Sequence, residues 1–155
     1  MAKEIEIYTD GSSLGNPGPG GWGTVVVEKS KIIMELGGFA KQTTNNRMEL
    51  QAVIEALKHM HKIHKEDTVT IYADSAYVLN GITSWVFGWE KNGWQTANKK
   101  PVLNQELWQE LISLVRGFKG KIIWQKVKGH SGHVYNDKAD EIATSCALKQ
   151  KFILS

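Results

Sequence analysis

Two segments of this sequence share one pattern, an apolar run that closes on an aspartate. Ile7-Tyr8-Thr9-Asp10 is the first and Ile71-Tyr72-Ala73-Asp74 is the second. If the two runs are neighbouring parallel strands, ~4.8 Å apart, Asp10 and Asp74 are their final residues and lie side by side at one end of a sheet. Two carboxylates placed there could bind one cation. Asp10 also has a purely structural interpretation, because aspartate commonly caps the turn that follows a strand.

Two further acidic residues border the apolar faces of predicted helices. Glu49 lies early in one helical pattern, and Asp140 opens the last one. A carboxylate that points at a sheet needs a partner, because an isolated buried charge is costly. A metal shared with the two aspartates would supply that partner. The alternatives are structural: Glu49 fits a capping box with Asn46 as the N-cap, and Asp140 fits the acidic N-terminus of a helix.

A set of carboxylates determines which metals would bind. Oxygen-only ligands suit Mg²⁺ or Mn²⁺, and no grouping of Cys and His indicates structural zinc. Two such ions ~3.5–4 Å apart, bridged by carboxylates, activate water and stabilise the leaving oxygen in phosphoryl transfer. The expected chemistry is therefore metal-assisted hydrolysis of a phosphate ester.

The histidines fall into two groups. His130 follows a predicted strand in the glycine-flanked segment Lys128-Gly129-His130-Ser131-Gly132-His133, where a loop histidine beside a metal cluster could transfer protons. His59, His61 and His64 lie among lysines at the end of a predicted helix. For these three we expect a solvated, basic helix end rather than a metal site.

The elements that must position these residues follow from periodicity and turn signals. Glycine and proline make residues 11–23 begin as a tight loop, and residues 75–91 are predicted as short helical segments broken at Gly81 and Gly88. The early strands form an antiparallel meander, and strands then alternate with helices. This order predicts an α/β fold, a five-stranded mixed sheet with three antiparallel and then parallel strands, flanked by helices. The predicted strands are 3–9, 22–28, 31–38, 68–73 and 121–127, and the longer helices are 46–60, 104–115 and 136–149.

Composition limits the class of protein. The chain has 155 residues, 41% of them hydrophobic and 23% charged, which predicts a single domain over 1–155. There is no apolar run of the ~20 residues that a membrane span needs, and no signal-peptide pattern. Cys146 is the only cysteine, which suits a reducing compartment. We expect a cytoplasmic monomer without an obligatory protein partner. The net charge of +3 permits a polyanionic ligand.

Four ordered motifs resemble those of ribonuclease H of the bacterial type I kind, and the resemblance covers nearly the whole chain. The motifs are Tyr8-Thr9-Asp10-Gly11-Ser12, Thr44-Asn45-Asn46-Arg47-Met48-Glu49, Ala73-Asp74-Ser75, and Lys128-Gly129-His130-Ser131-Gly132 continued through Asn136 to Asp140. The resemblance implies the ribonuclease H-like fold and an endonuclease that hydrolyses the RNA strand of RNA–DNA hybrids. It implies two Mg²⁺ ions, with Mn²⁺ as a substitute, and products with 3′-hydroxyl and 5′-phosphate ends.

The same resemblance implies roles for individual residues. The metal ligands and catalytic carboxylates would be Asp10, Glu49, Asp74 and Asp140, and His130 would assist proton transfer or product release. RNA 2′-hydroxyl groups, which both donate and accept hydrogen bonds, would be contacted by Glu49 and by Gly11, Asn16, Asn45 and Asn46. Ser12 would also belong to the substrate-binding residues. A phosphate of the DNA strand would be held by Thr44, Arg47 and Asn104. A substrate-binding protrusion over residues 85–101 would contribute Trp85, Trp89, Lys99 and Lys100.

The sequence departs from the family pattern in that protrusion and near Asp74. Ala76 stands where many relatives have a glutamine that contacts RNA. Glu90, Asn92 and Gln95 interleave with Lys91, which leaves Lys99 and Lys100 as the main positive pair. Fewer phosphate contacts predict weaker hybrid binding, a shallower salt dependence and reduced processivity. For Trp94 and Trp108 we expect core packing, and for Trp85 and Trp89 packing against DNA sugars or within the protrusion.

Three other functions are weighed against this one. A nuclease for DNA or structured RNA would not need the amide side chains Asn16, Asn45 and Asn46. A non-catalytic binding module would have no reason to keep four carboxylates. A phosphatase of small substrates would leave the tryptophan-rich insertion unexplained.

Overall fold

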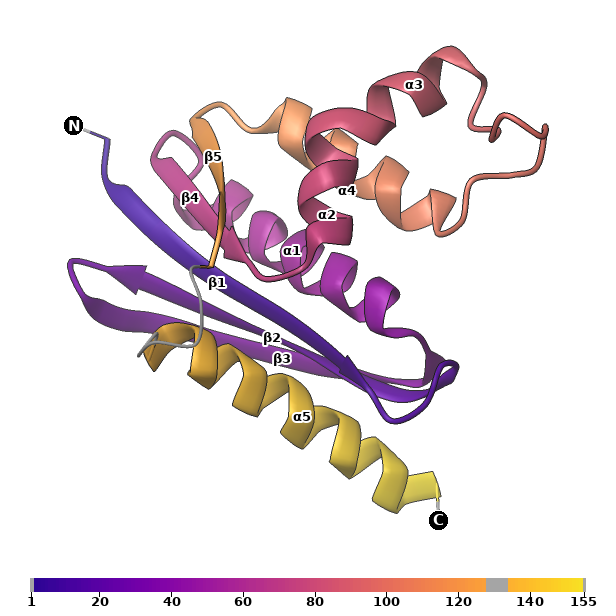
Figure 1. The fold of residues 1–155 in the computed structure, drawn as a ribbon. Helices are drawn as coiled ribbons and strands as arrows, with labels where there is room; N and C mark the ends of the chain where they lie inside the picture. Colours follow the sequence, from indigo (N-terminus) through magenta and orange to yellow (C-terminus); the bar gives the residue numbers. More distant parts are fainter. Residues whose placement is uncertain (1, 128–133, 155) are drawn as a thin grey trace.

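The fold is built on one mixed sheet, seen in the computed structural model, which describes residues 2–127 and 134–154 with side chains to residue 149 (Figure 1). The sheet has five strands in the order β3-β2-β1-β4-β5. β1–β3 pair antiparallel, and β4 and β5 add parallel to β1. This confirms the predicted ribonuclease H-like α/β architecture. The strands are β1 Glu4–Ser13, β2 Gly18–Glu28, β3 Lys31–Thr43, β4 Thr68–Ala73 and β5 Lys121–Lys126.

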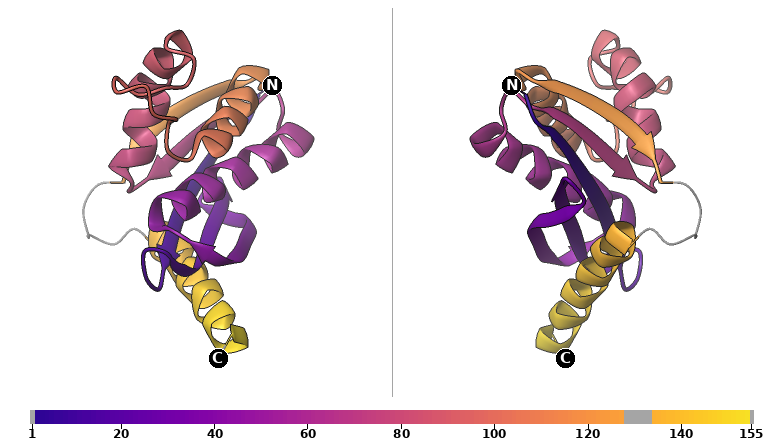
Figure 2. Two further views of the ribbon diagram at one scale, coloured as in Figure 1. Left: turned by 90° about the vertical axis from the view of Figure 1, so that its right-hand side faces the viewer. Right: turned by 90° about the vertical axis from the view of Figure 1, so that its left-hand side faces the viewer.

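Helices cover the two faces of the sheet (Figure 2). The helix α1 packs on β1 and β2 and also contacts α4, whereas α5 crosses the opposite face over β1, β2 and β3. No helix in the described part of the chain is long and apolar enough to cross a membrane. The helices are α1 Asn45–Ile63, α2 Ala76–Asn80, the π-helical η1 Gly81–Trp85, α3 Val86–Lys91, α4 Gln105–Gly117 and α5 Val134–Leu154.

The alternation of β1 explains why both faces need cover. Ile5 and Ile7 are buried in the core cluster that contains Leu50 and Ile54 of α1, whereas Tyr8 belongs to a second cluster with Ala139 of α5. Burial of each large aliphatic side chain contributes roughly 1.5–3 kcal/mol to the hydrophobic driving force. The central strand is therefore fixed from both sides, which also fixes the position of the side chains at its end.

Three predicted strand boundaries are wrong, and one of them is the end of β3, which lies at Thr43 rather than at residue 38. β1 does not end at Asp10 but continues to Ser13, and β2 begins at Gly18, so the predicted loop over 11–23 shrinks to residues 14–17. The glycines that indicated a loop are paired in the sheet, with Gly11 opposite Trp22. Residues 75–91 form short helical segments as predicted, and the boundary between α2 and η1 falls at Gly81, but the predicted break at Gly88 is wrong because Gly88 lies inside α3.

The end of α1 is not the solvated basic surface expected from its histidines. His64 is 8% exposed, and its Nδ1 lies 2.8 Å from Oδ2 of Asp67. His61 Nε2 lies 2.8 Å from the carbonyl oxygen of Leu114 in α4. These two rings connect the helix end to its neighbours, so that prediction is wrong for both.

Candidate active site

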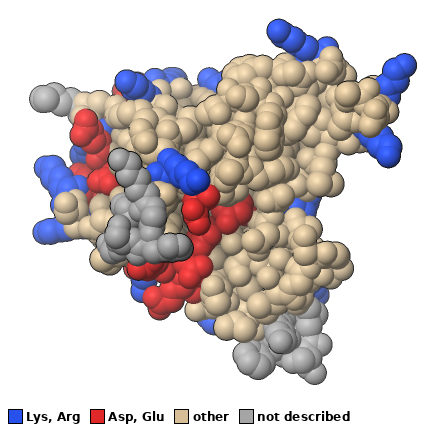
Figure 3. Space-filling model, viewed as in Figure 1, with Lys and Arg blue, Asp and Glu red and all other residues tan. Residues whose placement is uncertain are grey.

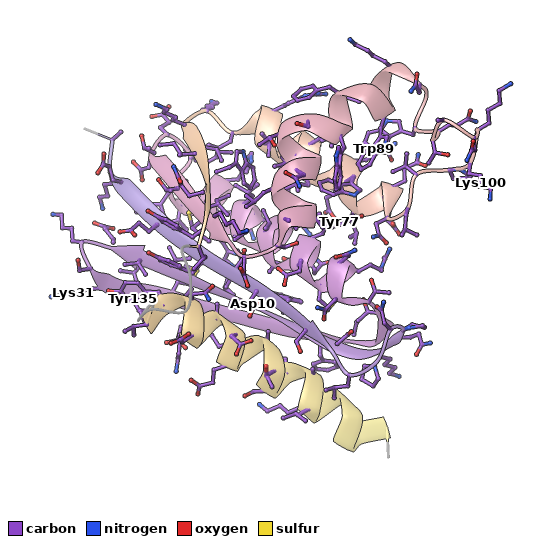
Figure 4. All side chains as sticks on the ribbon, viewed as in Figure 1. Asp10, Lys31, Tyr77, Trp89, Lys100 and Tyr135 are labelled. Carbon is purple, nitrogen blue, oxygen red and sulfur yellow. The ribbon has the colours of Figure 1, made fainter. Side chains whose placement is uncertain are left out.

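The parallel pairing of β1 with β4 ends at one level. The last paired residues are Thr9 and Ala73, and Asp10 and Asp74 follow them directly. Beyond this point the chain leaves the sheet for α2, so no strand lies on that side of the end of β1. The two aspartates therefore lie at the edge where α/β sheets bind ligands. Asp10 is labelled on β1 in Figure 4.

Asp10 is contacted from both layers of helices. Its carboxylate shares hydrogen bonds with Asp140, which comes from α5, and with Glu49, which comes from α1 on the other face. The Gly11 N–H donates to Asp10 Oδ1 at 2.9 Å and to Glu49 Oε1 at 3.1 Å. Asp74 is exposed and acts on Glu49 through its charge. Three of the four predicted carboxylates are thus in contact, and the fourth is within electrostatic range.

Gly11 is what allows α1 to reach the strand. A Cβ atom at this position would lie 2.4 Å from the backbone nitrogen of Glu49 and 2.5 Å from the carbonyl carbon of Met48. Any side chain would therefore push α1 away from β1. Because Gly11 has no side chain, the backbone of α1 at Met48 and Glu49 lies against the backbone of β1, and this places Glu49 beside Asp10.

The carboxylates of Asp10 and Glu49 are held in an environment that opposes their ionisation. Burial is the main cause, and with the neighbouring Asp140 it raises the pKa of Asp10 to about 7. Burial and the charge of Asp10 also raise the pKa of Glu49 well above its usual value. Asp and Glu side chains gather on the face of the molecule that is shown in Figure 3. Carboxylates crowded in this way are stabilised when a cation neutralises them.

The donor set fits a hard divalent cation. Every candidate ligand is a carboxylate, and Glu49 Oε2 is buried without a hydrogen-bond partner among the described residues. An orphaned buried oxygen of this kind is what a bound cation would satisfy. Among residues 2–127 and 134–149, no three His, Cys, Asp or Glu side chains already form a closed ligand group. The fit consequently rests on the pairwise contacts around Asp10 and on the orphaned oxygen.

The structural alternatives for the carboxylates do not hold. The N-cap of α1 is Thr44, whose side chain accepts from Arg47 N–H, so the predicted capping box of Asn46 with Glu49 is wrong. Asp10 lies within a strand rather than at a strand-to-turn junction. Because α5 begins at Val134, Asp140 lies beyond the first turn, where the helix dipole has little effect.

The raised pKa of Asp10 predicts how stability depends on pH. With EDTA present, the free energy of unfolding should fall by about 1–3 kcal/mol as the pH rises through 7, because folding disfavours the charged form. The contribution is fully present below the unfolded pKa near 3.8 and is lost as the pH passes the folded value of about 7. Urea unfolding at about pH 5 and about pH 8 measures it. The Asp10→Asn variant should lose most of this difference, and an unchanged difference would contradict the assignment.

A second group of predicted residues lines a hollow of about 190 Å³ beside the start of α1. Five of its six lining residues carry an amide or hydroxyl group, and such groups can form hydrogen bonds to sugar hydroxyls and phosphates. Leu103, which sequence reasoning did not single out, adds an exposed apolar side. The residues that line it are Asn16, Thr44, Asn45, Asn46, Leu103 and Asn104. Gly11 and Ser12 belong to the adjoining end of β1.

Arg47 is joined to this hollow through Asn104. Its Nη1 donates to Asn104 Oδ1 at 3.1 Å, and its two terminal nitrogens bind the Glu106 carboxylate at 3.1 and 3.2 Å. Arg47 and Asn104 were predicted to act together, and the structure brings them together. Glu106 was missed, and its only sequence signal is an acidic residue in the first turn of a helix.

The protrusion, residues 85–101, projects from the body of the fold (Figure 1). Trp108 is fully buried, and the Trp89 ring lies 5.5 Å from it and 6.0 Å from the Trp85 ring. Trp85 is 40% exposed and so remains available to a ligand. Lys100 extends from the far loop (Figure 4), and Lys99 beside it is also exposed. His130 lies outside the described residues, and its role stays a prediction.

Comparison with known proteins gives one family. The RNase H family model matches residues 2–147. The chain is 50% identical over 148 residues to ribonuclease H of Thermosynechococcus vestitus, covering 96% of this chain and 91% of that protein. It is 50% identical over 143 residues to ribonuclease H of Mesorhizobium japonicum, covering 92% and 77%.

Solved structures show the same fold. LC9-RNase H1, a type 1 RNase H, superposes with a TM-score of 0.84 at 33% identity, covering 97% of this chain and 74% of that one. LC11-RNase H1, solved in complex with an RNA/DNA hybrid, superposes with a TM-score of 0.74 at 24% identity, covering 97% and 99%. The second likeness is one of fold alone.

Proposed function

Because the chain belongs to the RNase H family, it is an endonuclease that cleaves RNA in RNA/DNA hybrids, and we propose that Asp10 is the centre of its active site. The observation that carries the assignment is the end of the β1–β4 pairing at Thr9 and Ala73, with Asp10 in contact with Glu49 and Asp140 beyond it. This function replaces the three alternatives considered from the sequence, namely another class of nuclease, a non-catalytic binding module and a phosphatase of small substrates.

The metal ligands in this proposal are Asp10, Glu49, Asp74 and Asp140. The cofactor is a pair of Mg²⁺ ions, for which Mn²⁺ can substitute, and when bound it supplies a water of lowered pKa and neutralises charge on the reacting phosphate. Glu49 would be held in position by the Gly11 N–H, which donates a hydrogen bond to its Oε1. Asp74 and Asp140, both exposed, would complete the ligand set from the solvent side.

The two strands of the hybrid would be told apart by neighbouring groups. On the RNA side, Asn16, Asn45 and Asn46 line the hollow beside β1 and would bind 2′-hydroxyl groups, together with Gly11 and Ser12. On the DNA side, Thr44, Arg47 and Asn104 would hold one phosphate, which suits the planar fork of a guanidinium. Amides bind the hydroxyl as donor and acceptor, so DNA in the RNA position would be rejected.

Further contacts would come from the protrusion. Trp85, the more exposed ring, and Trp89 would pack against DNA sugars, and Lys99 and Lys100 would contact phosphates. The proposed products carry 3′-hydroxyl and 5′-phosphate ends, and His130 would assist proton transfer. We further propose that residues 1–155 act as one domain and as a monomer in the cytoplasm.

Cleavage of a labelled RNA–DNA hybrid in Mg²⁺ tests the proposal. We expect cutting of the hybrid's RNA strand alone, with matched single-stranded RNA, RNA duplex and DNA duplex left intact. EDTA should reduce the rate to background, because the carboxylates alone cannot stabilise the reacting phosphate. Binding of the hybrid without cutting, under conditions where the protein is folded, would contradict the assignment of the carboxylates.

A further inference from the structure

Tyr77 lies between the protein core and the hollow beside the start of α1, and its hydroxyl accepts a hydrogen bond from each side. Its hydroxyl oxygen accepts from Trp108 Nε1 at 2.9 Å and from Asn104 Nδ2 at 3.0 Å. Trp108 is fully buried, whereas Asn104 lines the hollow. Tyr77 lies on α2, the helix that directly follows Asp74 and Ser75 (Figure 4). One hydroxyl group therefore links the rigid interior to a proposed substrate contact.

The hydroxyl of Tyr77 and the guanidinium of Arg47 hold the amide of Asn104 between them, one at each end. Because Nδ2 donates to Tyr77, Oδ1 is left to accept from Arg47 Nη1, at 3.1 Å. The reversed amide would place an N–H₂ group against the guanidinium, where both groups are donors. Asn104 has a left-handed backbone with φ of 61° and makes no side-chain capping bond to its helix. Its side chain is thus committed to Tyr77 and Arg47.

This chain of contacts leaves one edge of Arg47 available. The guanidinium has five N–H groups, of which Nη1 uses two, on Asn104 and Glu106, and Nη2 uses one, on Glu106. The remaining donors, on Nε and Nη2, have no partner among the residues that the structure describes. Two parallel donors on one edge match two oxygens of a phosphate.

We propose that the hydroxyl of Tyr77 is a positioning group for the DNA strand: by orienting Asn104, and through it Arg47, it preorganises the donors that receive a DNA phosphate. This inference rests on the proposed phosphate contact and adds to it a residue that does not touch the phosphate. Its expected effect is on binding of the hybrid rather than on the chemical step, since the carboxylate cluster does not depend on these bonds.

The ring of Tyr77 is held independently of its hydroxyl. The ring centroid lies 5.3 Å from that of Trp108 and 5.8 Å from that of Trp85, tilted by 57° and 62°. Tyr77→Phe keeps these contacts and removes only the acceptor for Asn104 and Trp108. Tyr135→Phe is a matched control, because it also removes one tyrosine hydroxyl, which donates to the Ser30 carbonyl on another part of the fold.

Steady-state cleavage of an RNA–DNA hybrid by the two variants tests the proposal. For Tyr77→Phe we expect KM to rise about tenfold with kcat changed less than about twofold, the pattern of lost binding in ground and transition state alike. Tyr135→Phe should leave both unchanged. The double variant Tyr77→Phe with Asn104→Ala should have the same KM as Asn104→Ala alone, because both substitutions remove the same hydrogen bond between Tyr77 and Asn104. Additive losses, or a loss confined to kcat, would overturn the proposal.

Hybrids with one neutral methylphosphonate at successive positions of the DNA strand separate positioning from general damage to the fold. At the contacted phosphate, wild-type KM should rise, and the further penalty of Tyr77→Phe should disappear. A penalty that persists there means that Tyr77 acts on the fold instead. If no position affects the wild type, the phosphate contact itself is refuted, and Tyr77 loses its role with it. If the wild type cuts no hybrid, the proposed function fails as well.

Discussion

Replacing Asp10 with asparagine should abolish cleavage of an RNA–DNA hybrid and at the same time stabilise the protein in EDTA. The amide keeps the shape of the side chain but cannot ligate a cation as a carboxylate does, so we expect kcat/KM to fall at least ~10³-fold. Burial and Asp140 raise the pKa of Asp10 to about 7, so the charged form strains the folded state above that pH. Removing the charge should increase the free energy of unfolding by about 1–3 kcal/mol at about pH 8.

Glu6→Gln is the matched control for this variant. Glu6 lies on the same strand as Asp10, and its replacement by glutamine removes the same negative charge. The Glu6 side chain accepts a hydrogen bond from the Tyr8 hydroxyl at 2.8 Å, and glutamine can retain this interaction. Hybrid cleavage and urea unfolding of both variants give the comparison. Near-full activity of Asp10→Asn would show that the carboxylate cluster is not the reaction site. Equal loss in both variants would point to a general effect of charge on β1.

The second large effect is expected from Gly23→Ala, a substitution at a residue that has no proposed catalytic or binding role. Gly23 pairs with Asp10 across β1 and β2. A Cβ there would lie 2.3 Å from the carbonyl oxygen of Ala139 and 2.9 Å from Cβ of Ile142, both on α5. The added methyl group must displace α5 beside Asp140. We expect a loss of about 1–3 kcal/mol in stability. We also expect a drop of roughly 10²-fold in kcat/KM, because a small misplacement of a catalytic group has such an effect.

Thermal unfolding and cleavage at a temperature where circular dichroism shows the variant folded measure the two effects separately. Gly88→Ala is the control for stability. A Cβ at Gly88 meets nothing within 4 Å, and the residue lies inside α3, so alanine should add roughly 0.5–1 kcal/mol. Full activity of Gly23→Ala would mean that the position of Asp140 relative to Asp10 is not critical, contrary to the proposed site.

The sequence was sufficient for the architecture because its periodic signals agree with burial. Every long strand and helix was predicted in the right order, and the repeat of the apolar run before Asp10 and Asp74 predicted their parallel pairing. The errors came from glycine. Residues 18–21 were assigned to a loop, but they belong to β2, and at Gly21 the absence of a side chain lets the backbone of α5 lie directly against the strand. A local signal for turns was overridden by packing between layers.

The site was predictable as a set of residues but not as a set of contacts. Thr44 rather than Asn46 caps α1, although both residue types cap helices well, because the backbone at Thr44 is extended and its side chain reaches Arg47 N–H. Tyr77 escaped notice since its partners Asn104 and Trp108 are distant in sequence, and only the packing of α2 against α4 brings them together. Hydrogen bonds between residues so far apart in the sequence produce no periodic pattern from which they could be predicted.

The placement of α5 against β1 also governs when the enzyme can first act. Asp10 comes early in the chain and Asp140 late, and the helix that carries Asp140 packs on the first three strands. On the ribosome the early strands emerge long before that helix, and contacts between such distant segments form late. A chain that carries only β1 to β5 would therefore present Asp10, Glu49 and Asp74 but lack Asp140, one of the four proposed metal ligands.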